Sequence, residues 1–264
     1  MRAEYERAFK SPHVWVSLIV CFLTLSGYSA AYWIGCNLMD EVMEYRQSAL
    51  QLSLGGIFFG GFMLLLPFCS ALAHSTSQVD DIRTGMMRWE VLRSGLQKYV
   101  GVKVSAAMSA AALSTALAFA LHAIFWNCIA IPCDPATYPM HTLYFAEDCI
   151  FRYMYDVCYG LPVYIEMTAT IAFTASVWAV IGLATSVWIP DKLLTVTIPS
   201  FLYYLWSADV VAYFTGISMP EPGALFNDAL TISKAVITVA TYMCMLCIGV
   251  VVYYMGCRKR CCNA

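Results

Sequence analysis

Six long apolar runs dominate the pattern of hydrophobic and polar positions along the chain. They cover residues 14–35, 49–73, 104–131, 167–189, 193–214 and 235–257, and each is 22 to 28 residues long. Asp209 is the single charged residue within them. A helix rises about 1.5 Å per residue, so about 20 apolar residues cross the roughly 30 Å hydrocarbon core of a bilayer. Because the runs do not alternate as barrel strands do, they predict an all-α membrane protein with six transmembrane helices.

Composition strengthens this interpretation, since 61% of the residues are hydrophobic and only 12% are charged. A soluble domain carries about 25% charged residues. The formal net charge of -2 leaves no strongly basic surface, which excludes a nucleic-acid partner. The first run is too long for the core of a signal peptide, and Glu4 and Glu6 precede it. The pattern therefore predicts one transmembrane domain over residues 1–264, with the lipid bilayer as its solvent.

The distribution of basic residues predicts the orientation of the six helices. Cytoplasmic loops are enriched in Lys and Arg. If both ends of the chain, the 74–103 segment and the 190–192 turn share one side, that side holds 12 of the 15 basic residues. The other side keeps Arg46, Arg152 and Lys234. We therefore expect both termini in the cytoplasm, and a longer outer loop over residues 132–162.

The cytoplasmic segment 74–103, between the second and third predicted helices, has the most informative sequence. Asp80 or Asp81 is a candidate cap for a helix start, and Met86, Met87, Val91 and Leu92 recur near helical spacing. The pattern predicts a short amphipathic helix on the inner membrane surface that ends at Ser94-Gly95. A simple surface-lying connector would show the same features.

This segment resembles the coupling region in the membrane subunits of type-2 ATP-binding-cassette exporters. The resemblance rests on Asp81-Ile82-Arg83-Thr84-Gly85 with Arg93, Tyr99 and Lys103 downstream, and on the lead-in Glu6-Arg7-Ala8-Phe9-Lys10-Ser11-Pro12. It implies a permease in the plasma membrane that works as a homodimer or pairs with a similar permease. It further implies docking on a separate ATPase subunit, which would bind ATP and Mg. The residues that would dock are Asp81, Arg83, Thr84, Gly85, Met86, Met87 and Arg88.

A separate ATPase is consistent with the chain itself, which lacks the G-x-x-x-x-G-K-[ST] phosphate-binding loop. No catalytic motif stands out, so we expect a transporter subunit rather than an enzyme. The alternative is a membrane sensor or accessory subunit that transports nothing and holds a cytoplasmic partner on the same segment. Peptides, lipids and drugs all stay open as substrates.

Four further residues are candidates for packing or transport. Gly56 and Gly60 lie four apart in the second run, a spacing that lets helix backbones approach closely in lipid. His122 and Asp209 lie within apolar runs, where a polar side chain either serves function or is hydrogen-bonded inside the bundle. They are the candidates for a substrate path, with packing as the alternative for His122. The histidines show no metal-binding spacing.

Disulfide bonds are the remaining expectation from the sequence. Four cysteines fall between residues 128 and 158, on the predicted outer side. An oxidising exterior favours a bridge among them.

Overall fold

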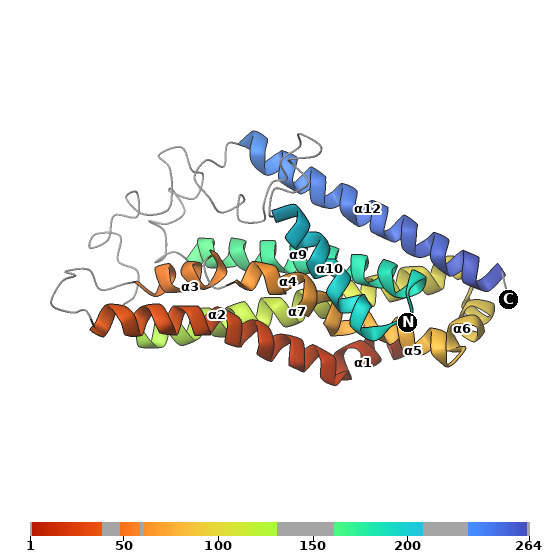
Figure 1. Cartoon of the computed structure of the whole chain (residues 1–264), viewed down its shortest axis with the longest axis horizontal. Helices are drawn as coiled ribbons and strands as arrows, with labels where there is room; N and C mark the ends of the chain where they lie inside the picture. Colours follow the sequence, from red (N-terminus) through yellow and green to blue (C-terminus); the bar gives the residue numbers. More distant parts are fainter. Residues whose placement is uncertain (1, 39–47, 59–60, 131–160, 208–231, 263–264) are drawn as a thin grey trace.

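The computed structural model describes residues 2–38, 48–58, 61–130, 161–207 and 232–262. Within these residues the regular structure is helical. The helices are α1 (Arg2–Lys10), α2 (Pro12–Leu38), α3 (Ala49–Phe58), α4 (Phe62–His74), α5 (Thr76–Arg83), α6 (Met86–Ser94), α7 (Leu96–Ile129), α9 (Leu161–Trp188), α10 (Lys192–Ser207) and α12 (Ile232–Cys262). They form an elongated bundle in which the longest helices run roughly along its length (Figure 1).

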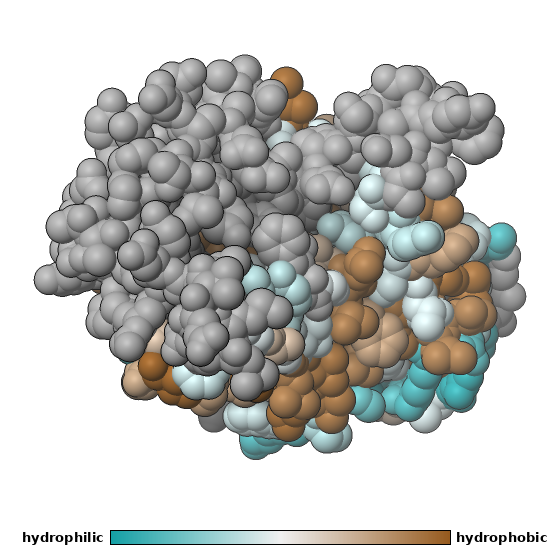
Figure 2. All heavy atoms as spheres, turned by 60° about the vertical axis from the view of Figure 1, so that its left-hand side comes forward, coloured by the Kyte–Doolittle hydropathy of each residue, from teal (hydrophilic) through white to brown (hydrophobic). Residues whose placement is uncertain are grey.

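Five helical segments of the described chain are long and apolar enough to cross a membrane. They are Pro12–Gly35, Phe62–Arg83, Leu96–Ile129, Leu161–Trp188 and Val236–Cys261. Apolar residues cover much of the described surface in Figure 2, as expected of a face that meets lipid. The all-α prediction is therefore confirmed for the described residues, and these five segments have the length and composition of membrane-spanning helices.

The predicted span over residues 193–214 is described only as far as Ser207. Its described part, α10, has 16 residues. At about 1.5 Å per residue these 16 residues alone are shorter than a hydrocarbon core, and the rest of the predicted span lies outside the described residues.

The predicted boundaries of the second span and of the segment after it are wrong. Gly61 adopts a left-handed conformation (φ 69°) between α3 and α4, so the run from residue 49 is not one helix. After His74 the chain continues into α5 with little interruption, and the membrane-length segment is Phe62–Arg83. Helix α7 begins at Leu96, eight residues before the predicted start. The predicted 74–103 loop therefore shrinks to the stretch from residue 84 to 95, which contains α6.

The buried share of each membrane-length segment distinguishes inner helices from outer ones. The segments Phe62–Arg83 and Leu161–Trp188 are each 67% buried, whereas Pro12–Gly35 is 28% buried and Val236–Cys261 is 22% buried. Helices α4 and α9 therefore form the centre, and α2 and α12 cover opposite sides. Since lipid tails are as apolar as leucine, close packing and hydrogen bonds hold such helices together.

Small residues allow the inner helices to approach closely. A Cβ atom added at Gly182 of α9 would lie 2.8 Å from the Ala71 Cβ and 3.0 Å from the Ser75 Oγ. Beside this contact, the Ser75 hydroxyl donates a hydrogen bond to the Ala179 carbonyl at 2.8 Å. Between α2 and α4, the Ser17 hydroxyl donates to the Cys69 carbonyl at 2.9 Å. The bundle thus uses glycine and serine where helices touch.

The tight turn predicted between the fourth and fifth runs is present between α9 and α10. The Asp191 carboxylate accepts hydrogen bonds from the backbone N–H groups of Leu193 and Leu194, at 2.9 and 3.1 Å. This caps the start of α10. The turn lies at the same end of the bundle as α6, the start of α1 and the end of α12 (Figure 1). Both ends of the described chain therefore emerge together.

We predict that Gly182→Leu separates α4 from α9 and destabilises the protein. Overpacking of a close contact costs about 1–3 kcal/mol. The free energy of unfolding, measured by titrating SDS into mild-detergent micelles, should fall by this amount. Gly27→Leu is the matched control, because nothing lies within 4 Å of a Cβ added at Gly27 in α2. Equal stability of the two variants would contradict the close approach.

Candidate functional site

Helix α6 is set apart from the bundle by a glycine at each end. Gly85 has a left-handed backbone (φ 74°) and separates α5 from α6. Gly95 has φ 83° and separates α6 from α7. Such conformations are costly for other residues. The two breaks place α6 at the extreme end of the bundle, beside the described ends of α1 and α12 (Figure 1). The predicted short helix and its end at Ser94-Gly95 are confirmed.

One face of α6 presents large apolar side chains to the surroundings. Met86 is 49% exposed, Trp89 is 72% exposed and Leu92 is 80% exposed. These three residues, spaced three apart, share one side of the helix, and we call them the docking face. The opposite side holds Met87, which is 3% exposed and packs with Val91 in the core. The amphipathic pattern of the sequence therefore combined residues from two opposite sides and missed Trp89.

The structure divides the predicted docking residues into two groups. Arg83, Thr84, Met86 and Arg88 are exposed and Gly85 is partly buried. Asp81 and Met87 are buried, so their side chains do not reach a partner. Asp80 and Asp81 are also not caps at a helix start, because both lie in the last turn of α5. The Thr84 hydroxyl donates to the Asp80 carbonyl at 2.8 Å and helps to end α5.

Asp81 belongs to a buried group of charges beneath α6. The Lys103 ammonium of α7 lies 2.5 Å from the Glu4 carboxylate and 2.5 Å from the Asp81 Oδ2. The contact between Lys103 and Asp81 is an ion pair whose angles do not fit a hydrogen bond, so the Asp81 Oδ2 accepts no hydrogen bond from the described residues. The Lys103 side chain is 1% exposed and that of Asp81 is 2% exposed. One lysine thus joins α1, α5 and α7.

Arg7 and His74 complete this charge cluster, which we define as Glu4, Arg7, His74, Asp81 and Lys103. The Arg7 guanidinium donates to the Asp81 Oδ1 at 2.6 Å. The His74 Nε2 lies 3.1 Å from the Glu4 Oε1. Burial alone would raise the pKa of Glu4, but the hydrogen bond with His74 and the charge of Lys103 outweigh it. The pKa falls from 4.5 to about 2, so Glu4 is ionised at neutral pH.

Gln78 links this end of the bundle to α6 and α12. Its Oε1 accepts hydrogen bonds from the Tyr99 and Tyr253 hydroxyls, each at 2.8 Å. Its Nε2 lies 3.5 Å from the Met87 Sδ. Gln78 is fully buried and therefore brings α5, α6, α7 and α12 together through one side chain. A displacement of α6 would consequently be transmitted to α5, α7 and α12.

The α9–α10 turn is attached to the same region by exposed ion pairs. The Lys192 ammonium lies 2.8 Å from the Asp80 Oδ1. The Arg83 guanidinium donates to the Pro190 carbonyl at 3.1 Å and lies 3.7 Å from the Asp191 Oδ2. Exposed pairs contribute about 0–1 kcal/mol each. They position the turn next to α5 rather than stabilise the fold.

The other predicted site residues lie elsewhere. His122 is fully buried, and its Nδ1 lies 3.0 Å from the Ser26 Oγ. A Cβ added at Gly56 would lie 2.6 Å from the Leu25 carbonyl oxygen and 3.2 Å from the His122 Nε2. Gly56 is therefore a packing residue, as predicted, and His122 lies beside it between α2, α3 and α7. Gly60 and Asp209 fall outside the described residues.

The predicted outer cysteines can be compared with the structure only at Cys128. This residue is exposed and forms no disulfide bond within the described part of the chain. The outer loop 132–162 begins in a stretch that the structure leaves undescribed and ends at the start of α9.

The charge cluster was the main feature that sequence reasoning missed. A lysine at the edge of an apolar run is expected to reach water, yet the Lys103 side chain is buried. The available signal was indirect. Lys103 stands directly before a 28-residue apolar run, Glu4 precedes the run at 14–35, and Asp81 follows the run at 49–73, all on the same predicted side. Only the packing of α1 against α7 shows that these residues meet.

Comparison with protein-family models, with curated proteins and with solved structures gives no match. The resemblance to exporter permeases therefore rests on the amino-acid sequence alone.

We predict that Lys103→Met destabilises the protein strongly, because Glu4 and Asp81 lose their shared positive partner. Removal of one member of a buried ion pair costs about 3–5 kcal/mol. The free energy of unfolding in mild detergent should fall by this amount. Lys98→Met, an exposed lysine on the same helix, should change it by no more than about 0.5 kcal/mol. Similar values for both variants would show that the cluster does not hold the helices together.

Proposed function

We propose that this chain is the membrane subunit of an exporter that is driven by a separate ATP-binding-cassette ATPase. In this proposal six helices cross the plasma membrane and both ends lie in the cytoplasm, on the side that carries most of the basic residues. The chain acts as a homodimer or pairs with a similar permease. ATP and Mg bind to the ATPase and not to this chain.

The observation that carries the proposal is the docking face of α6. Trp89 and Leu92 are 72% and 80% exposed at the end of the bundle, on a helix whose opposite side is anchored. Large aromatic and apolar side chains are the residues that contribute most to binding when a partner buries them. A surface-lying connector would need no anchoring to three other helices, here α5, α7 and α12. These connections support the interpretation that α6 transmits movement of a bound partner to the bundle.

The contacts beneath α6 offer a route for that force. Met87 contacts Gln78, which binds Tyr99 of α7 and Tyr253 of α12. Arg83, at the end of α5, reaches the α9–α10 turn. Closure of an ATPase against α6 would therefore shift α5, α7 and α12 together. Because breaking the charge cluster would cost free energy, we expect α1 to move together with α5, α7 and α12.

We predict that Trp89→Asp or Leu92→Asp prevents assembly with the ATPase. Loss of a central contact in such an interface costs about 2 kcal/mol or more, which is roughly a 30-fold loss of affinity. Tagged variants purified from membranes of the native host in mild detergent should lose the ATPase, as detected by mass spectrometry. Insertion and unfolding free energy should stay normal, because both side chains are exposed.

Gln97→Asp is the matched control, since Gln97 is exposed just beyond α6 and outside the docking face. It should retain the ATPase and its ATP hydrolysis. If the Trp89 and Leu92 variants keep the ATPase, the docking face is misassigned. If the wild-type chain captures a cytoplasmic protein without an ATP-binding cassette, the sensor or accessory role replaces the exporter.

A further inference from the structure

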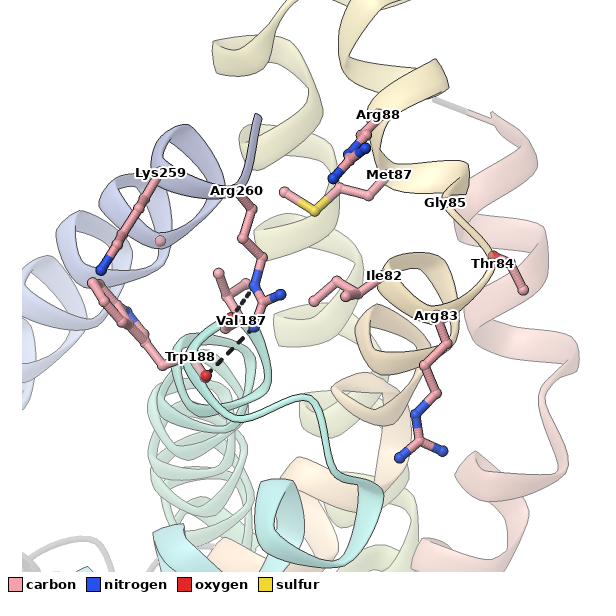
Figure 3. A pocket seen from close by; sticks show the side chains of 11 residues that line it. Ile82, Arg83, Thr84, Gly85, Met87, Arg88, Val187, Trp188, Lys259 and Arg260 are labelled. Carbon is pink, nitrogen blue, oxygen red and sulfur yellow. Dashed lines mark hydrogen bonds between the residues drawn. The ribbon is translucent and has the colours of Figure 1, made fainter. Parts of the chain in front are cut away.

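A basic groove lies beside α6, on a different side from the docking face. Its volume is about 680 Å³, and its walls come from the α5–α6 junction, the end of α9 and the end of α12. Four of the lining residues are cationic, namely Arg83, Arg88, Lys259 and Arg260, and none of the lining residues is acidic. Figure 3 shows Arg88 on the α6 side and Lys259 and Arg260 on the α12 side. The groove is therefore suited to an anion.

Of the four cations of the groove, Arg83 pairs with the Asp191 carboxylate, whereas Arg88, Lys259 and Arg260 form no ion pair among the described residues. Arg260 donates to the carbonyls of Val187 and Trp188, which are neutral acceptors at the end of α9. The Lys259 ammonium lies 5.1 Å from the centre of the Trp188 ring, a cation–π contact. Within the described residues, Arg88 forms no ion pair, and Arg83 faces Asp191 only at 3.7 Å. Most of this positive charge is thus free to bind a ligand.

An apolar slot lies next to the basic groove, on the other side of Trp188. It has a volume of about 510 Å³ and lies between α9, α10 and α12. Ile198, Leu202, Ile248 and Val252 are among its lining residues, and Trp188 lines both the slot and the groove. The Trp188 Nε1 donates to the Val252 carbonyl at 3.3 Å, which fixes the indole at this junction. The two spaces therefore adjoin at Trp188, one lined by cations and the other by apolar side chains, and we call them together the path.

We infer that this path binds an anionic phospholipid. The phosphate would lie among Arg88, Lys259 and Arg260, and an acyl chain would lie along the slot beside Leu202 and Ile248. Ile248 precedes Lys259 by 11 residues of α12, or about 16 Å, a distance that would lead from the phosphate at the interface into the hydrocarbon core. Basic pockets between transmembrane helices on the cytoplasmic side bind acidic headgroups. A soluble phosphate would use the groove but would leave the slot without a role.

The position of the site suits a lipid better than a protein segment. The slot lies between α9, α10 and the outer helix α12, and its lining is apolar apart from Thr185. Trp188 is 45% exposed there, as expected of an aromatic residue at the membrane interface. The inference does not depend on the proposed exporter function, because it concerns the chain alone and its own membrane.

The test compares lipid binding by the purified chain, without any ATPase, in a neutral detergent. Native mass spectrometry should show that dioleoyl phosphatidylglycerol binds more tightly than dioleoyl phosphatidylcholine. The double variant Arg88→Gln/Lys259→Gln should lose about 10- to 30-fold in phosphatidylglycerol affinity, since each basic residue near a lipid surface contributes about 1 kcal/mol. Its phosphatidylcholine binding and its unfolding in neutral detergent should match those of the wild type.

The control variant Arg93→Gln/Lys98→Gln removes the same charge from exposed positions at the same end of the bundle but outside the groove. It should change the affinity by less than about threefold. Equal losses in both double variants would overturn the site and show general surface attraction. Displacement of the lipid by glycerol phosphate at equal concentration would instead indicate a site for soluble phosphates. A photo-crosslinker at position 88 that captures a protein other than the ATP-binding-cassette subunit, and no lipid, in native membranes would indicate an acidic protein segment.

Discussion

The burial of one positive charge, that of Lys103, is the constraint on which this end of the molecule depends. A buried ammonium is tolerated only next to opposite charge, and here Glu4 and Asp81 supply it from two other helices. The helices α1, α5 and α7 must therefore meet at one point. Arg7 and His74 then occupy the remaining faces of the two carboxylates. Because charge pairs tolerate little displacement, this cluster is a rigid base for α6.

That base explains why two different surfaces meet at the same end. The outer face of α6 stays apolar and exposed, while its inner face is bound through Met87 and Gln78. The ends of α9 and α12 close against each other through Arg260 and Trp188, which leaves a cationic groove beside α6. In our account the first surface meets a protein and the second meets lipid. On this account, a lipid bound in the groove between α6 and α12 affects how far α12 moves when α6 moves.

The sequence predicted five of the membrane helices and the short helix before Gly95, because charge-free length and glycine positions are local signals. It failed at His74–Arg83, since serines, Gln78 and Asp81 resemble a loop until inner helices bury them. It also failed to pair Lys103 with Glu4, which are 99 residues apart. Helical spacing alone did not show which side of α6 faces outward. Such pairings depend on how helices cross, and no local pattern encodes that.

The central claim is that the outer face of α6 receives a nucleotide-driven partner, and site-specific photo-crosslinking tests it most directly. The photoreactive amino acid p-benzoylphenylalanine would replace Trp89 in membranes of the native host, with Trp15 of α2, which is 58% exposed, as the comparison position. The account predicts a covalent adduct with a polypeptide that contains an ATP-binding cassette at position 89 and none at position 15. Adducts with lipid alone at position 89 would contradict it.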